Sequence, residues 1–124
     1  MTRRGFLQAL LSSSVVAFVP TFLTETFNRI TIDPTQGNVF RLINEQHKLN
    51  ISVKPSVNGQ RITIAHKAVG RDGILKLDTG VGGFRFGTHI TTLTPTTNGK
   101  TDFIDAVYNA TDNKWHIISY VKGF

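Results

Sequence analysis

From Phe27 onward, apolar and other residues alternate with a period of two over most of the chain. Because successive side chains of a β-strand point to opposite faces, this alternation predicts strands that turn one face toward a core. The pattern is clearest where Leu49, Ile51 and Val53 alternate with polar residues. The runs that show it are FNRITID (27–33), NVFRLIN (38–44), KLNISVKP (48–55), QRITIAHK (60–67), ILKLDT (74–79), GFRFGT (83–88), HITTLT (89–94), TDFIDAVYN (101–109) and KWHIISYVKGF (114–124).

Turn-forming residues separate these runs. Asn-Gly at 58–59 and 98–99 and Asp-Gly at 72–73 accept the positive φ angles that tight turns require. Short strands at a spacing of roughly ten residues are typical of all-β sandwiches and barrels. We therefore expect residues 28–124 to form an all-β domain, an antiparallel β-sandwich or barrel-like sheet of about eight short strands. Residues 1–27 would be an N-terminal arm or a signal-like segment.

The first residues, MTRRGFLQALL, allow two interpretations. The letters TRR-x-FLQ resemble the twin-arginine export signal, and a basic start followed by an apolar run fits a signal peptide. Alternatively, the apolar residues have the i, i+1, i+4, i+5 spacing of one side of an amphipathic helix, which would dock on a neighbouring subunit. The residues of this docking arm would be Arg3, Arg4, Phe6, Leu7, Leu10 and Leu11. Both interpretations stay open.

The composition narrows the possible chemistry. The chain has no cysteine, which excludes disulfides, thiolate metal sites and a thiolate nucleophile. Its formal net charge is +6, but the basic residues are spread singly along the chain. A dispersed charge favours a solvated basic surface that meets an acidic partner, and we expect no specific nucleic-acid binding.

No motif predicts catalysis, a cofactor or a metal. The histidines at 47, 66, 89 and 116 are scattered, without an HxH or HExxH pattern, and we expect them to be partly exposed strand residues. Asp102 and Asp105 are three positions apart in a predicted strand, so they would point to opposite faces and flank or cap a turn. The stretch GVGG at 80–83 lacks the GK[ST] of a phosphate loop and more simply lets Phe84 and Phe86 turn into the core.

The final run, KWHIISYVKGF, has apolar residues on both predicted faces. Alternation would place Trp115 with Ile117 on one face, and Ile118 with Tyr120 on the other. Strands that are apolar on both faces are covered on both. One cover would be the core of the domain, and the other could be a second copy of the chain. The candidate subunit interface consists of Tyr108, Trp115, Ile118 and Tyr120, and the sequence leaves open which of them face the core.

Residues 37–124 resemble, in the order of their features, a domain of tailed-bacteriophage virion proteins. The stretches that carry the resemblance are GNVFRLINEQHKLNISV, NGQRITIAHKAVGRDGILKL, GFRFGTHITTLTPTTNGKTDFIDAVYN and DNKWHIISYVKGF. Such domains occur in tail fibres, head fibres and capsid decoration proteins, as small β-sandwiches that commonly assemble as trimers.

The resemblance implies a virion structural protein without enzymatic activity, a homo-oligomer in contact with major capsid or tail proteins. The short N-terminal part favours a compact capsid decoration or tail accessory protein. Two alternatives remain. One is a periplasmic or secreted β-rich binding module exported by a twin-arginine signal, and the other is a receptor-binding fibre tip that contacts the host surface. Fold-level resemblance alone does not decide among them.

Overall fold

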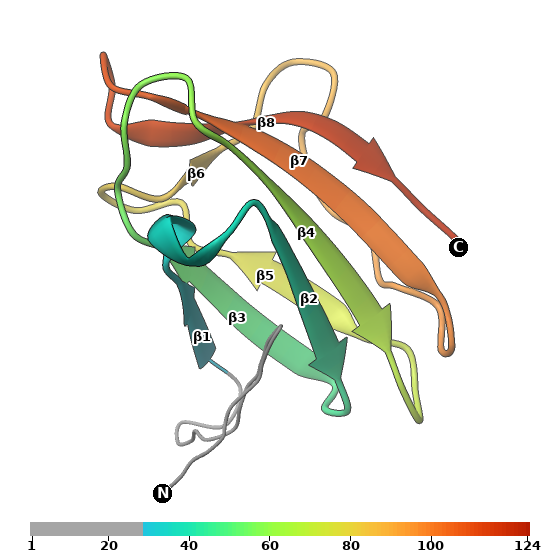
Figure 1. Ribbon diagram of the computed structural model, residues 1–124. Coiled ribbons are helices and arrows are strands. Elements are labelled where there is room, and N and C mark those ends of the chain that lie inside the picture. The colour runs from blue at the N-terminus through green and yellow to red at the C-terminus, as the bar shows by residue number, and fades with distance from the viewer. Residues whose placement is uncertain (1–28) are drawn as a thin grey trace, which may run out of the picture.

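The computed structural model describes residues 29–124, which form eight strands and one short 3-10 turn (Figure 1). In chain order these are β1 (Arg29–Ile32), the 3-10 turn η1 (Pro34–Gln36), β2 (Val39–Asn44), β3 (Lys48–Val53), β4 (Arg61–Ala68), β5 (Ile74–Leu77), β6 (Phe84–Arg85), β7 (Thr101–Asn109) and β8 (Lys114–Val121). The all-β prediction is therefore confirmed. Within the described part of the chain, no helix is long and apolar enough to cross a membrane.

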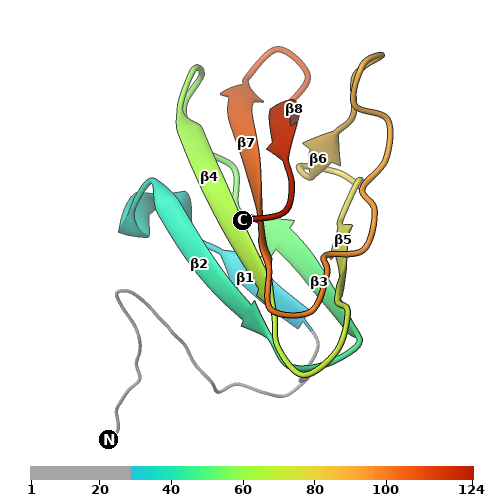
Figure 2. The ribbon, with the colours of Figure 1, turned by 90° about the vertical axis from the view of Figure 1, so that its right-hand side faces the viewer.

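The strands form two sheets. One has three strands in the order β1-β3-β5, and the other has five in the order β2-β4-β7-β8-β6. Figure 2 shows the strands of the five-stranded sheet in this succession. The antiparallel prediction is wrong for most of the strand pairs. The pairs β1–β3, β2–β4, β3–β5 and β6–β8 are parallel, and only β4–β7 and β7–β8 are antiparallel.

The parallel pairing follows from how the chain crosses between the sheets. From β1 to β5, consecutive strands belong alternately to the three-stranded and the five-stranded sheet. Each crossing reverses the direction of the chain, so strands two elements apart run the same way and pair in parallel. Alternation reports only which face a side chain occupies. It carries no information on strand direction, which is why the sequence did not predict this arrangement.

Both sheets contribute side chains to one core. Trp115 lies at its centre, fully buried, with its ring edge-to-face against Tyr108 at a centroid distance of 5.1 Å. The indole Nε1 donates a hydrogen bond of 3.1 Å to the carbonyl oxygen of Lys54, just beyond β3, and so connects the two sheets. A buried Trp N–H needs such a partner. The core consists of Ile32, Leu42, Leu49, Ile51, Val53, Ile62, Ile64, Leu75, Leu77, Phe84, Ile104, Ala106, Tyr108, Trp115 and Ile117.

A β-bulge changes the phase of β8. Ala106 pairs with Ile117, but its neighbour Asp105 pairs with Ser119, which leaves Ile118 as an extra residue. Beyond the bulge, Tyr120 pairs with Ile104 and packs against the core. The prediction that Ile118 and Tyr120 share a face is therefore wrong, because the extra residue resets the alternation.

The run HITTLT, expected to be a strand, lies in an irregular connection between β6 and β7. Thr96 of this connection forms an isolated antiparallel bridge to Gly73 with N–O distances of 2.9 and 2.7 Å, and Gly99 and Lys100 at its end form backbone hydrogen bonds with Ala68. Tyr120 fastens the same segment, because its hydroxyl donates to the carbonyl oxygen of Thr94. Tertiary contacts rather than a ladder of hydrogen bonds hold the connection in place.

Candidate functional site

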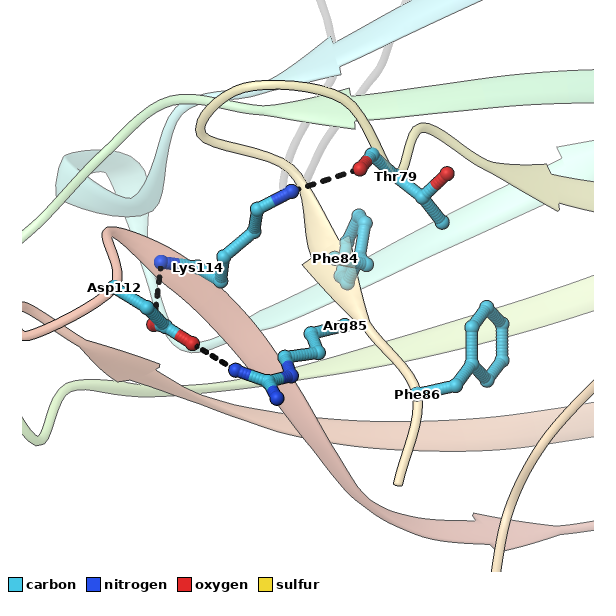
Figure 3. A pocket seen from close by; sticks show the side chains of 6 residues that line it. All are labelled: Thr79, Phe84, Arg85, Phe86, Asp112 and Lys114. Atoms are coloured by element: carbon cyan, nitrogen blue, oxygen red, sulfur yellow. Dashed lines mark hydrogen bonds and ion pairs between the residues drawn. The ribbon is translucent and has the colours of Figure 1, made fainter. Parts of the chain in front are cut away.

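A solvent-open hollow of about 330 Å³ lies beside β6 and the beginning of β8 (Figure 3). Two phenylalanines, two cations, one carboxylate and one threonine line it. These residues are Thr79, Phe84, Arg85, Phe86, Asp112 and Lys114. They come from the β5–β6 connection, from β6 and its end, and from the β7–β8 turn together with the first residue of β8.

The glycine-rich stretch before β6 positions Phe84 beside the hollow. The carboxylate of Asp78 accepts a hydrogen bond from the backbone N–H of Gly80, and the N–H of Phe84 donates to the Asp78 carbonyl oxygen at 2.7 Å. A Cβ on Gly83 would clash with that carbonyl group, so only glycine fits there. The tight connection turns Phe84 into the core, where it is 1% exposed, while Phe86 is half-buried. The prediction for GVGG is thus confirmed for Phe84, whereas Phe86 is only partly buried against the core.

The β7–β8 turn holds the carboxylate of the hollow. Asp112 Oδ1 accepts the N–H of Lys114, and Oδ2 accepts hydrogen bonds of 2.8 Å from Arg85 Nη1 and from His116 Nε2. Partial desolvation acts to raise the pKa of Asp112, but the hydrogen bonds from Arg85 and His116 outweigh it and hold the pKa below its ordinary value. Asp112 therefore stays ionised and orients the guanidinium.

Lys114 is hydrogen-bonded to the β5–β6 connection. Its Nζ donates hydrogen bonds to the carbonyl oxygens of Thr79 and Gly80, at 2.8 and 2.7 Å. The ammonium group thereby ties the β5–β6 connection to β8 and becomes a cation of fixed position. Sequence analysis missed this hollow, because its residues come from three separate segments with no shared motif.

A second polar cluster is buried inside the five-stranded sheet. His66 is fully buried, which corrects the expectation that the histidines are partly exposed. Its Nδ1 lies 2.9 Å from Thr96 Oγ1 and its Nε2 lies 3.1 Å from Asn44 Nδ2. Thr96 Oγ1 donates its single hydrogen to Asp102 at 2.7 Å. His66 therefore donates from Nδ1 and accepts at Nε2, the tautomer of a neutral ring.

Burial lowers the pKa of His66 to about 4, although the charge of Asp102 acts in the opposite direction. Burial alone would raise the pKa of Asp102, but hydrogen bonds from Lys122, Thr96 and the N–H of Gly123 outweigh it and lower the pKa. Lys122 Nζ lies 2.6 Å from Asp102 Oδ2. This buried cluster is complete in its hydrogen bonds, so it acts in structure rather than as a free reactive group.

The structure places Asp102 and Asp105 on opposite faces of β7, as predicted, but within the strand rather than at a turn. Asp102 faces inward with Ile104, and Asp105 faces outward, where it accepts a hydrogen bond of 2.6 Å from Thr63 Oγ1. The signal for the buried cluster was present in the sequence. His66 follows Ile62 and Ile64 on one face of its strand, so it shares their burial.

The candidate subunit interface separates into two pairs. Tyr108 and Trp115 are buried at 3% and 0% exposure in the core of the chain itself, so they are not available to a second copy. Ile118 remains 43% exposed at the bulge, and Tyr120 is half-buried against the core. The predicted docking arm, with Arg3, Arg4, Phe6, Leu7, Leu10 and Leu11, lies outside the described residues.

The outer face of the five-stranded sheet presents two groups of side chains, and the exposed Val39 and Ile43 of β2 lie among the first of them. Arg41 of β2 and Arg61 and Lys67 of β4 are exposed there, and we call them the basic strip. Ile118 and Val121 of β8 and the C-terminal Phe124 are also exposed, and we call them the apolar strip. Backbone hydrogen bonds of 3.0 and 3.1 Å between Phe124 and Thr101 hold the end of the chain against β7.

Within residues 29–124, no group of three histidine or acidic side chains is placed to hold a metal ion. In comparisons with known proteins, no family model matches the chain, and no curated protein or solved structure is significantly similar to it.

Proposed function

We propose that the chain is a structural protein of a tailed-bacteriophage virion, a capsid decoration or tail accessory protein. The observation that supports this best is the outer face of the five-stranded sheet, where the basic strip and the apolar strip both face solvent in the described chain. Exposed apolar side chains gathered on one face are typical of surfaces that bind other proteins. The resemblance in feature order to virion domains supplies the class of partner.

The two strips suit two different contacts. Like charges oppose the meeting of one basic strip with another, so self-association would use the apolar strip. Ile118, the exposed member of the predicted interface, belongs to that strip, and a trimer is the assembly we propose. The basic strip, together with the arm at 1–27, would dock on the acidic surface of a capsid or tail protein.

The self-association is tested by the mass of the full chain in solution, measured by light scattering. Ile118→Glu with Val121→Glu places charge in the apolar strip and is expected to convert trimers into monomers. Val57→Glu is the control, because Val57 is also an exposed apolar residue, at 69%, but lies in the β3–β4 connection. A monomeric wild-type chain, or equal dissociation in the control, would contradict the proposed interface.

The virion assignment is tested on particles released from the natural host and purified by density gradient. The protein is expected in intact particles at many copies, and particles without it are expected to lose resistance to heat or osmotic shock. Its absence from purified particles would refute the assignment. Particles that stay robust without it but fail to adsorb to cells would replace it with the fibre-tip alternative.

The twin-arginine pattern in TRRGFLQ favours a second candidate, an exported β-rich binding module. The intact mass of the native protein separates the two. A mass that includes residues 3–11 supports a retained docking arm. Loss of about the first seventeen to twenty-seven residues, as after signal-peptide cleavage, supports export to the periplasm or beyond.

A further inference from the structure

The hollow beside β6 combines a guanidinium available for a ligand with an aromatic ring. The side chain of Arg85 is 61% exposed, and among the described residues the structure records one acceptor for it, Asp112 through Nη1. Arginine has five N–H donors, so the remaining donors can meet an incoming acceptor. A carboxylate matches the planar fork of a guanidinium through two parallel hydrogen bonds.

The other lining residues indicate which chemical group carries that carboxylate in the ligand. In Figure 3 the ring of Phe86 stands at the hollow on the far side of Arg85 from Asp112. A half-buried phenylalanine presents an apolar face on which the C–H face of a sugar ring packs. The Thr79 hydroxyl and Asp112 lie in the same lining and suit hydroxyl groups. The volume of about 330 Å³ exceeds what a bare carboxylate fills and accommodates one six-membered ring.

The balance of charge in the lining suits an anion. Arg85 and Lys114 supply two positive charges to the lining and Asp112 supplies one negative charge, which leaves a single excess positive charge. Such a site favours an anion over a neutral ligand. Lys114 is held by two carbonyl oxygens, so its charge stays at the wall when a ligand enters.

We propose that this hollow binds a carboxylated sugar, a hexuronic acid or a related acidic sugar unit. Arg85 pairs with the carboxylate, and Phe86 packs on the ring. The proposal goes beyond the virion assignment and is independent of it, because no residue of the hollow belongs to the basic or the apolar strip. An open site for a ligand of this size is expected to bind weakly, with a Kd of about 1 mM.

The test is an NMR titration of the full chain with matched small molecules. D-glucuronate and D-glucose share one ring and differ in the carboxylate, whereas acetate supplies the carboxylate without the ring and phosphate supplies a different anion. Glucuronate is expected to shift the amide signals of residues 79–86 and 112–116. Glucose, acetate and phosphate are each expected to bind at least about tenfold more weakly. Absence of glucuronate binding, or equal binding of any of the other three, overturns the proposal.

Substitutions of Arg85 complete the test. Arg85→Gln is expected to weaken glucuronate binding about tenfold or more, the usual effect of losing charge-assisted hydrogen bonds. Arg85→Lys keeps the charge without the fork and is expected to fall between Arg85→Gln and wild type. Arg71→Gln is the control, because it removes the same charge from an exposed residue of the β4–β5 connection. Equal weakening in Arg71→Gln reveals non-specific attraction and refutes the site.

Discussion

The buried cluster around His66 predicts that the protein loses stability in mild acid. Nε2 of His66 accepts a hydrogen bond from the Asn44 amide, which is oriented by the N–H of Gln46 on its Oδ1. Protonation of Nε2 would bring two donors face to face inside the protein. Burial of the ring and this conflict disfavour the charged form, and the pKa falls to about 4 from its ordinary value of 6.5.

The sign and size of the effect follow from linkage. The unfolded chain binds a proton at His66 between about pH 6.5 and pH 4, and the folded chain does not. The contribution of His66 to the free energy of unfolding is therefore fully present above the pKa of the unfolded chain. It is lost as the pH falls toward the pKa of the folded chain. A difference of about 2.5 pKa units, at about 1.4 kcal/mol per unit, amounts to about 3.5 kcal/mol, most of it lost by pH 4.5. The pKa of Asp102 is lowered from 3.8, so Asp102 stays ionised in this window.

Urea unfolding at pH 7 and pH 4.5, followed by the fluorescence of the single tryptophan, measures this loss. His66→Gln is the decisive variant, because an amide supplies one donor and one acceptor but does not titrate. Its stability at pH 7 is expected to be lower than that of wild type, but its loss between the two pH values should nearly vanish. A wild-type loss below about 1 kcal/mol, or the same loss in His66→Gln, would refute the reasoning.

Three further substitutions test contacts of buried residues. In Gly73→Ala the new Cβ would lie 2.8 Å from Asn44 Nδ2, so urea unfolding should show a loss of about 1–3 kcal/mol. Phe84→Ala empties a fully buried site, and the same assay should show a loss of about 3–5 kcal/mol. Lys122→Met removes the ammonium group from Asp102, so the acid-unfolding midpoint, followed by circular dichroism, should move to higher pH. For each variant, a value equal to that of wild type would contradict the corresponding argument.

Alternation was sufficient to find most of the strands and the inward faces of those without a bulge. Leu49, Ile51 and Val53 were predicted from the period of two to share a face, and all three are buried in the core. The face of a strand is a local property, because it depends on neighbouring positions alone. The direction of pairing is not local. It depends on which sheet the chain enters after each turn, and no residue in the turns encodes that choice.

The same division between local and non-local properties applies to the functional surfaces. The exposure of Arg41, Arg61 and Lys67 on one face follows from their places in two strands that pair in register. The hollow does not follow from any strand pattern, since Arg85 and Asp112 are 27 positions apart and meet only because β6 pairs with β8. Likewise, Thr96 reaches His66 from an irregular connection, at a separation of 30 positions.

The bulge in β8 yields a final prediction about register. Without Ile118, the sequence of β8 would alternate without interruption, and Trp115, Ile117 and Tyr120 would keep their inward faces. Deletion of Ile118 is therefore expected to leave a folded protein with a moderately lower Tm. Deletion of Val107 is the matched control. It removes one residue from β7, where alternation is unbroken, and turns either Tyr108 or the preceding inward residues to the outside.

The two deletions are compared by thermal unfolding and by the fluorescence of the buried tryptophan. The Val107 deletion should abolish cooperative unfolding, because it exchanges core and surface over half a central strand. The Ile118 deletion should retain it. If both deletions abolish folding, the extra residue is itself required, because bulges also set the local twist of a sheet. If both are tolerated, the register of β7 and β8 is less strictly determined by the buried side chains than we argue.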